Sequence, residues 1–254
     1  LSKKLKIIFF STPGDYTSLQ RLINLKVPVI KVSSGLSNNY PLIREIILKK
    51  IPLIISTGLS EKKDLIELKN YLNKFRFKKI SILKCTSKYP LPIDKIDMNN
   101  IKHFKKIFNF PIGYSDHSIS LLTPAIAVSK GAKIIEKHFT FDNKSLGADH
   151  HISLNYKDFS RMVTDIRNIE KMYGNGIKEP HEEEIINLKN IRRYCVAKTN
   201  INPGDLFSLD NVVFKRLGNE KKGIEAIDFH KIENTESSSL FKIGSIIKKD
   251  KSSE

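Results

Sequence analysis

Six short apolar runs recur along the first 140 residues, and each ends in serine, threonine or another polar residue. The runs are IIFFST (7–12), PVIKVSS (28–34), PLIIST (52–57), ISILKCTS (80–87), FPIGYSDHS (110–118) and KIIEKHFT (133–140). Helix-like segments lie between them, with plausible caps at Asp15 and Ser60. Strands that alternate with helices at intervals of 22–30 residues predict βα units and a parallel sheet of six strands.

The polar ends of these runs indicate where ligands would bind. In a (β/α) barrel the C-terminal ends of the strands hold the active site, and in an open doubly wound sheet ligands bind at the same ends. The chain contains no GxGxxG and no GxxxxGK[ST] motif, which weakens the nucleotide-binding form of the open sheet. The sequence therefore predicts an α/β fold of the barrel type.

The pattern changes after the sixth run. Residues 155–174 have apolar side chains at helical spacing, and 179–193 is typical of an exposed, charged connecting helix. A compact stretch with an expected turn at 202–205 follows. The expected domains are a barrel domain over 1–175, a linker helix over 176–191 and a small domain over 192–250.

Composition excludes several functional classes. The net charge of +17 raises the question of nucleic-acid binding, but lysine supplies 36 of the 44 basic residues and is spread over the whole chain. Since arginine is the better residue for bidentate phosphate and base contacts, we expect no nucleic-acid partner. No apolar run is long enough to span a membrane. The two cysteines, Cys85 and Cys195, lie far apart and favour a reducing, cytoplasmic location.

Seven motifs in order resemble one family. FSTPGD, KVSSG, ISTGLS, KCTSKYPLP, GYSDHS, EKHFTFD and GADHHISL are similar to the N-acetylneuraminate (sialic acid) synthase family. The tail, with VAKTNINPGD and FKRLG, resembles the antifreeze-like SAF domain of the same family. The resemblance implies a (β/α)8 TIM-type barrel followed by an SAF domain, a divalent metal (Mn²⁺ or Mg²⁺), and a homodimer in which the SAF domain of one chain caps the barrel of the other.

The resemblance also implies the site residues. The metal ligands fall on His117 and His138, which end two successive runs. Glu136 lies two residues before His138 and faces the same side of a strand, so it is expected to contact a metal-bound water or a substrate. Asp149 matches the aspartate that binds amino-sugar hydroxyls. The residues implied for substrate binding are Thr12, Lys31, Ser34, Ser56, Ser87, Tyr89, Ser115 and Arg216.

For each of these residues a structural role stays open. A serine or threonine can simply end a strand, a histidine can be a hydrogen-bonding core residue, and Arg216 can be a surface arginine. The sequence also departs from the family at Leu36, usually acidic, at Lys84, usually histidine, and at Leu217, usually proline. These departures affect the expected substrate more than the expected fold.

The implied reaction condenses phosphoenolpyruvate with an N-acetylated amino-sugar aldehyde, such as N-acetylmannosamine, to give a sialic-acid-type nonulosonate and phosphate. Six of the eight barrel units are expected here, and the family's first two, which carry a catalytic glutamate and a phosphate-binding lysine, are not found. We therefore expect a truncated chain with little or no activity alone. The alternatives are synthesis of legionaminic acid, pseudaminic acid or a spore-coat sugar, and a non-catalytic binding protein of the same fold.

Overall fold

In the computed structural model the chain forms two compact units, residues 1–174 and 175–254. The structure describes residues 1–218 and 223–248, so 219–222 and 249–250 of the expected small domain at 192–250 lie outside the described residues. Among the described residues, no helix combines the length and the apolar character that crossing a bilayer requires.

The first unit alternates strands and helices, as the runs predict. Its elements are α1 (Tyr16–Asn24), β1 (Ile30–Val32), η1 (Ser34–Leu36), α2 (Tyr40–Leu48), β2 (Leu53–Ser56), α3 (Lys62–Asn73), β3 (Ile80–Cys85), η2 (Ile93–Lys95), α4 (Asn99–Ile107), β4 (Ile112–Asp116), α5 (Leu122–Ser129), β5 (Ile135–Lys137), η3 (His150–Ile152) and α6 (Tyr156–Met172). The helix predicted over 155–174 is confirmed as α6.

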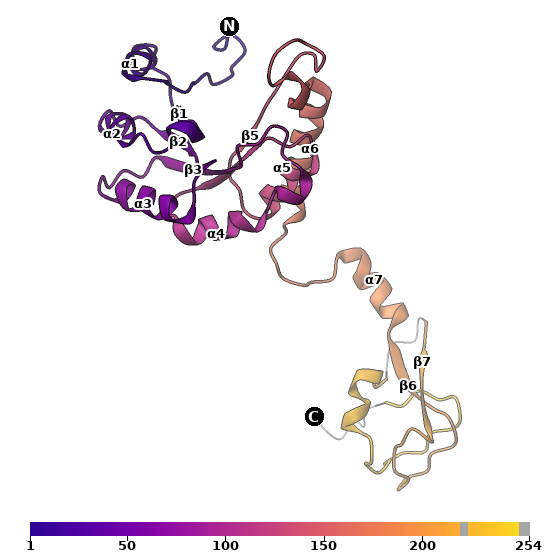
Figure 1. Ribbon diagram of the computed structural model, residues 1–254. Helices are drawn as coiled ribbons and strands as arrows, with labels where there is room; N and C mark the ends of the chain where they lie inside the picture. Colours follow the sequence, from indigo (N-terminus) through magenta and orange to yellow (C-terminus); the bar gives the residue numbers. More distant parts are fainter. Residues whose placement is uncertain (219–222, 249–254) are drawn as a thin grey trace. The chain divides into compact units, whose positions relative to one another are not determined.

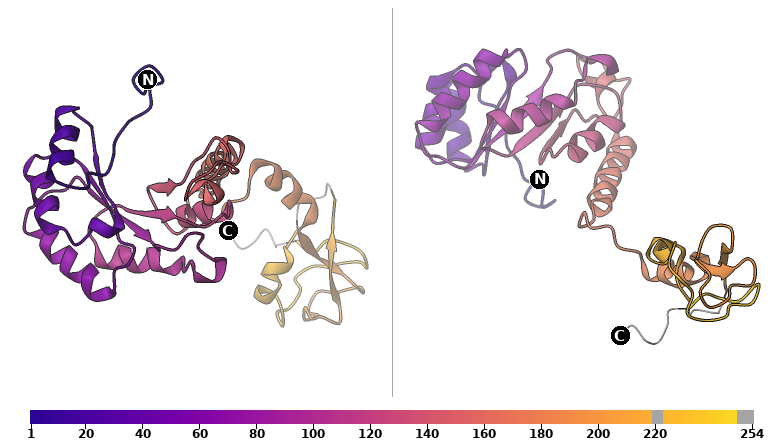
Figure 2. Two further views of the ribbon diagram at one scale, coloured as in Figure 1. Left: turned by 45° about the horizontal axis from the view of Figure 1, so that its top comes forward. Right: turned by 90° about the horizontal axis from the view of Figure 1, so that it is seen from below.

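A five-stranded parallel sheet forms the centre of this unit, in the order β1-β2-β3-β4-β5. Consecutive strands are neighbours because each intervening helix makes the crossover that a parallel pair needs. The sheet curls, and α2, α3 and α4 lie along its convex side (Figures 1 and 2). Within the described residues the sheet is open, with β1 and β5 as its edge strands, so the barrel-type α/β character is seen but not a closed ring of eight strands.

The prediction of a sixth strand over residues 7–12 is wrong, because the structure has no strand there. One backbone hydrogen bond, from the amide of Lys31 to the carbonyl of Ser11 at 3.1 Å, joins the segment to β1. Ile7, Ile8 and Phe9 are 64%, 69% and 54% exposed. An apolar run forms a strand where its side chains pack on a half-buried surface, and these side chains have none.

The helix starts follow from reciprocal capping. Asp15 begins α1 as predicted: its Oδ1 accepts from the amide of Ser18 at 2.6 Å, and Ser18 Oγ accepts from the amide of Asp15 at 3.0 Å. The cap predicted at Ser60 is one residue too early. Glu61 is the N-cap of α3, and its amide donates to Asp64 Oδ2 at 2.7 Å, so the third helical residue completes a capping box.

The main core lies between the sheet and its helices. Ile82, at the middle of β3, is fully buried, as are Ile43 on α2, Leu72 on α3 and Ile101 on α4. These side chains belong to one apolar cluster that joins three helices to β3, the middle strand of the sheet. The central strand is therefore the part of the first unit whose packing matters most to the position of the strand ends.

Replacing Ile82 with alanine is expected to lower the free energy of unfolding by about 3 kcal/mol, because it removes buried methyl groups and leaves a cavity between three helices. Urea denaturation followed by far-ultraviolet circular dichroism measures the change. The matched control is Leu59→Ala, since Leu59 is 80% exposed, and its expected effect is within about 0.5 kcal/mol. Equal losses in the two variants would contradict the packing described here.

The second unit contains α7 (Glu182–Ile191), which confirms the helix predicted over 179–193, and an antiparallel pair formed by β6 (Arg193–Ala197) and β7 (Val212–Arg216). A 3₁₀ helix, η4 (Ala226–Lys231), follows. The turn predicted at 202–205 is confirmed by the amide of Asp205, which donates to the carbonyl of Asn202 at 3.0 Å. A separate small core fills this unit, made by Cys195, Ala197, Ile201, Phe207, Val212, Ile224, Phe229 and Ile247.

Candidate active site

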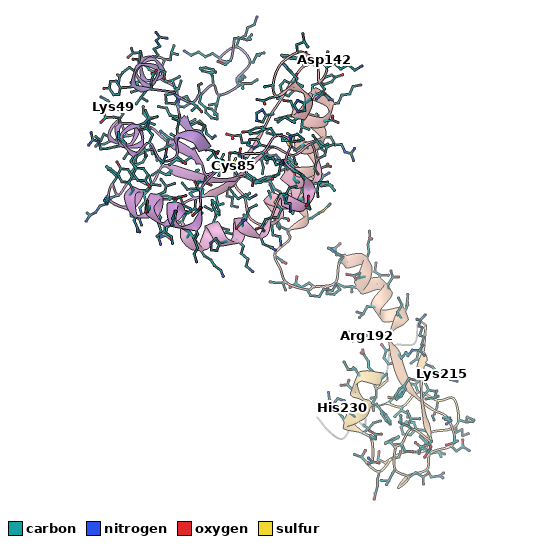
Figure 3. All side chains as sticks on the ribbon, viewed as in Figure 1. Lys49, Cys85, Asp142, Arg192, Lys215 and His230 are labelled. Atoms are coloured by element: carbon teal, nitrogen blue, oxygen red, sulfur yellow. The ribbon has the colours of Figure 1, made fainter. Side chains whose placement is uncertain are left out.

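The pleat of the sheet separates two sets of polar side chains. Cys85, Ser115 and Glu136 are in register on three neighbouring strands, so they share one face. Tyr114 is next to Ser115 and packs in the core beneath the helices, so the face of Ser115 is the concave one. Figure 3 shows Cys85 at the middle of the first unit. The concave face therefore carries polar groups at the C-terminal strand ends.

An ion pair connects the two edge strands across this face. Lys31 Nζ on β1 lies 2.9 Å from Glu136 Oε2 on β5, and it also donates to Oε1 at 3.1 Å. Ser115 Oγ donates to the same Oε1 at 2.7 Å. The Lys31 side chain is 9% exposed and that of Glu136 is 38% exposed. Three residues that the sequence placed in the site thus meet, although Lys31 and Glu136 are 105 residues apart in the chain.

The two histidines also meet. The ring centroids of His117 and His138 are 5.3 Å apart, with an angle of 63° between the planes. Tyr89 contacts both rings, with centroid distances of 4.0 Å to His117 and 5.8 Å to His138. His138 Nδ1 lies 3.7 Å from Asp149 Oδ2. Four of the predicted residues are therefore neighbours at the ends of β4 and β5.

The hydrogen bonds of His117 define its tautomer. His117 Nδ1 lies 2.8 Å from the carbonyl oxygen of Thr86. A carbonyl only accepts, so Nδ1 carries the hydrogen, and in the neutral ring Nε2 keeps its lone pair. Metal-ligating histidines usually donate their other ring N–H to a carbonyl or carboxylate, and His138 likewise turns Nδ1 toward Asp149. The arrangement fits two imidazoles that offer Nε2 to a cation.

Burial and hydrogen bonding shift the pKa values of these groups. Burial, together with the nearby His117, lowers the pKa of His138, so His138 is neutral near pH 7. Burial alone would lower the pKa of His117, but the contacts with Cys85 and Thr86 outweigh it and raise that pKa. Burial alone would raise the pKa of the Cys85 thiol, but the contacts with His117 and two serines outweigh it and lower that pKa.

Two more of the predicted serines, Ser34 and Ser87, lie close to Gly58. Ser34 Oγ accepts from the amide of Gly58 at 2.9 Å. A Cβ at Gly58 would lie 2.2 Å from Ser87 Oγ and 2.7 Å from Ser34 Oγ. Any larger residue at this position would therefore push both serines out of place, so Gly58 is the residue that allows them to approach one another.

The remaining predicted residues differ in their surroundings. Ser56, at the end of β2, is 2% exposed, and its Oγ has no hydrogen-bond partner among the described residues. Thr12 directly follows Ser11, whose carbonyl contacts β1. Arg216 is an exposed residue at the end of β7 in the second unit.

The structure adds buried polar residues that the motifs contain but the site prediction omitted. Asp116 and Lys137 form an ion pair at 2.7 Å on the convex face. The alternation within GYSDHS and EKHFT could have indicated this, because their neighbours face the concave side. Lys84, one of the departures from the family, also turns to the convex side, where it donates to Thr86 Oγ1 at 3.2 Å and to the carbonyl of Ile96.

No group of three or more histidine, cysteine, aspartate or glutamate side chains in the described part of the chain is arranged to hold a metal ion. The histidine pair would thus supply two ligands and leave further coordination positions open. Imidazole nitrogen together with oxygen ligands is compatible with Mn²⁺, whereas Mg²⁺ prefers oxygen alone. The donor set fits a divalent transition metal better than Mg²⁺.

A curled parallel sheet with polar side chains gathered at its C-terminal strand ends is the arrangement of the α/β barrel enzymes. Comparison with protein families identifies the chain more specifically than this class of fold does. The NeuB family model matches residues 1–178, and the chain belongs to this family.

Curated relatives and solved structures agree with the family. An uncharacterized protein of Methanocaldococcus jannaschii is 40% identical over 92% of this chain and 70% of its own length. The N,N'-diacetyllegionaminic acid synthase of Campylobacter jejuni is 36% identical over 90% of this chain and 68% of its own length. The N-acetylneuraminic acid (sialic acid) synthetase of Leptospira borgpetersenii superposes with a TM-score of 0.68 at 33% identity, over 75% of this chain and 67% of that one.

Proposed function

We propose that this chain serves the condensation of phosphoenolpyruvate with an N-acetylated amino-sugar aldehyde, which gives a sialic-acid-type nonulosonate and phosphate. The observation that carries the proposal is the meeting of two groups on one concave face: the Lys31–Glu136–Ser115 cluster and the His117–His138 pair. The first is suited to an anionic substrate and the second to a divalent cation. Family membership supports the same reaction class.

Lys31, Ser56 and Ser115 are the groups proposed to hold the phosphate of phosphoenolpyruvate. Lys31 is a nearly buried point charge whose ammonium has donors beyond those that Glu136 accepts. Ser56 Oγ is buried with no hydrogen-bond partner in the part of the chain that the structure describes. Such a hydroxyl gains most from a ligand oxygen because leaving it unsatisfied is costly. Hydroxyls and an ammonium fixed in advance stabilise charge without rearranging as the phosphate leaves.

His117 and His138 are proposed to hold Mn²⁺ through Nε2. When bound, the metal would act as a Lewis acid on the sugar aldehyde. Asp149, whose side chain is half exposed beside His138, is proposed to accept hydrogen bonds from adjacent sugar hydroxyls. The Tyr89 ring packs against both imidazoles. Glu136, held by Lys31 and Ser115, is proposed to orient a water or a substrate hydroxyl.

The second unit is proposed to be an SAF domain, and the functional assembly a homodimer in which it caps a partner's barrel. Arg216 would then bond the acetamido oxygen of the substrate. The supporting observations are that Arg216 is exposed at the end of β7 and that the unit has its own small core. A monomer by light scattering would exclude this role for Arg216.

The sugar can be N-acetylmannosamine or a diacetylated relative. The Campylobacter relative, a synthase named for N,N'-diacetyllegionaminic acid, favours the diacetylated alternative as the second candidate. Competition between the two sugars for one preparation of the protein separates these possibilities. A non-catalytic binding protein would bind phosphoenolpyruvate and metal without any turnover in the assembled enzyme.

The test measures binding and turnover separately, since ligand binding to the chain can be detected whether or not the reaction proceeds. Calorimetry should detect Mn²⁺ binding and phosphoenolpyruvate binding, and pyruvate should bind at least tenfold more weakly because it lacks the phosphate. Phosphate release with N-acetylmannosamine then measures turnover. If neither Mn²⁺ nor phosphoenolpyruvate binds to the folded chain, the proposed function is wrong.

A further inference from the structure

A fully buried carboxylate lies behind the histidine pair. Asp116 Oδ1 accepts from the amide of Ser118 at 2.9 Å and from Tyr114 Oη at 3.2 Å. Asp116 Oδ2 accepts from Thr123 Oγ1 at 2.6 Å and from Lys137 Nζ at 2.7 Å. The side chains of Asp116 and Lys137 are 0% and 1% exposed. All four hydrogen bonds come from within the protein, so this carboxylate is fully satisfied and has no room for a ligand.

Along the sequence, residues of this hydrogen-bond network alternate with residues of the candidate site. Asp116 and Ser118 flank His117, and Lys137 lies between Glu136 and His138. The ladder between β4 and β5 ends at the pair Asp116–Lys137. Each histidine therefore follows the last ladder pair directly, beyond the regular pairing of the two strands. The side-chain ion pair joins the strands at this last rung, and Lys137 also donates to the carbonyl of Ser118 just beyond it.

The energetics of such a pair favour a role in geometry. Removing two charges from water costs several kcal/mol, and well-packed apolar residues are often as stabilising as a buried ion pair. A fully satisfied polar network instead fixes one arrangement, because every alternative leaves a donor or an acceptor without a partner. Here the fixed arrangement is the spacing of the two strand ends from which the imidazoles project.

We propose that the Asp116–Lys137 pair positions His117 and His138 and keeps them at their mutual distance. Thr123 of α5 supports the pair through its hydrogen bond to Asp116. Neither Asp116 nor Lys137 touches the reacting atoms. The pair acts through the backbone of β4 and β5, and Thr123 connects this rung to the helix layer. The consequence for metal affinity rests on the proposed function, whereas the consequence for ring geometry does not.

The experiment uses the whole chain with ¹⁵N-labelled histidine and no metal, and it compares Lys137→Met with Lys133→Met. Lys133 is an exposed lysine just before β5, so it matches the charge change without touching the network. In Lys137→Met the ring signals of His117 and His138 should shift or broaden, while those of His103 and His230 stay in place. Lys133→Met should leave all four unchanged.

Two further measurements separate positioning from stability. Mn²⁺ affinity per folded molecule should fall at least tenfold in Lys137→Met and stay unchanged in Lys133→Met. Thr123→Val removes the hydroxyl that hydrogen-bonds to Asp116, Ser118 and Ser120 but keeps the ion pair. It should shift the same two ring signals less, and it replaces Lys137→Met in the test if that variant does not fold. A lowered Tm with unmoved ring signals in the folded variants would overturn the positioning role. If the unaltered chain does not bind Mn²⁺, the proposed function fails, and the ring signals still decide the positioning role.

Discussion

His138→Ala is expected to abolish measurable Mn²⁺ binding, with an affinity loss of at least 100-fold. The reason is the number of ligands: the described residues bring only two imidazoles together, His117 and His138, and no larger ligand group. Losing one of the two proposed ligands leaves a single imidazole, which holds a divalent ion weakly. Isothermal titration of metal-free protein with Mn²⁺ at pH 7.5 measures the effect, because burial keeps His138 neutral there.

The matched control is His103→Ala, since His103 is an exposed histidine on α4. Its Mn²⁺ affinity should equal that of the unaltered chain. A second comparison is His138→Gln, which keeps a polar side chain but removes the imidazole, and it should behave like His138→Ala. Retention of Mn²⁺ affinity by both His138 variants would remove His138 from the proposed metal site, whatever the result for other residues.

The parallel sheet could be predicted because strand–helix alternation is a local pattern. Five of the six apolar runs form strands, α6 lies where helical spacing indicated it, and α7 lies in the charged segment that indicated a connecting helix. The run at 7–12 shows the limit. Its composition matches that of the other five, but whether an apolar run becomes a strand depends on a neighbouring strand and a surface to cover, and neither can be read from the run itself.

The sequence could indicate which residues of the motifs share a face of the sheet, but not which of them touch. Alternation puts Ser115 and Glu136 on one face once their strands are neighbours. That Lys31 reaches Glu136 from the opposite edge depends on the curl of the whole sheet, which no short motif contains. The same motifs also hold Asp116 and Lys137, whose burial depends on α5 packing behind β4. Function-bearing motifs thus combine residues that face a ligand with residues that face the core.

Lys31→Met is expected to lower the affinity for phosphoenolpyruvate about 100-fold, or about 2.7 kcal/mol. The Lys31 side chain is nearly buried on the concave face, and the phosphate that we propose it binds would lose charge-assisted hydrogen bonds. The substitution also leaves Glu136 without its cation. Since the Glu136 side chain is 38% exposed, solvent compensates part of that loss, and the expected destabilisation is about 1–2 kcal/mol. Calorimetry and urea denaturation measure the two effects.

The double variant Lys31→Met/Glu136→Gln separates ligand binding from stability. Replacing the carboxylate with an amide removes the unpaired charge, so the free energy of unfolding should recover while the affinity for phosphoenolpyruvate stays low. The control Lys63→Met breaks an ion pair with Glu61 whose side chains are 72% and 73% exposed, and it should change neither quantity. If the double variant regains affinity together with stability, Lys31 holds the sheet edges together rather than the phosphate, because binding would then follow the integrity of the fold and not the presence of the cation.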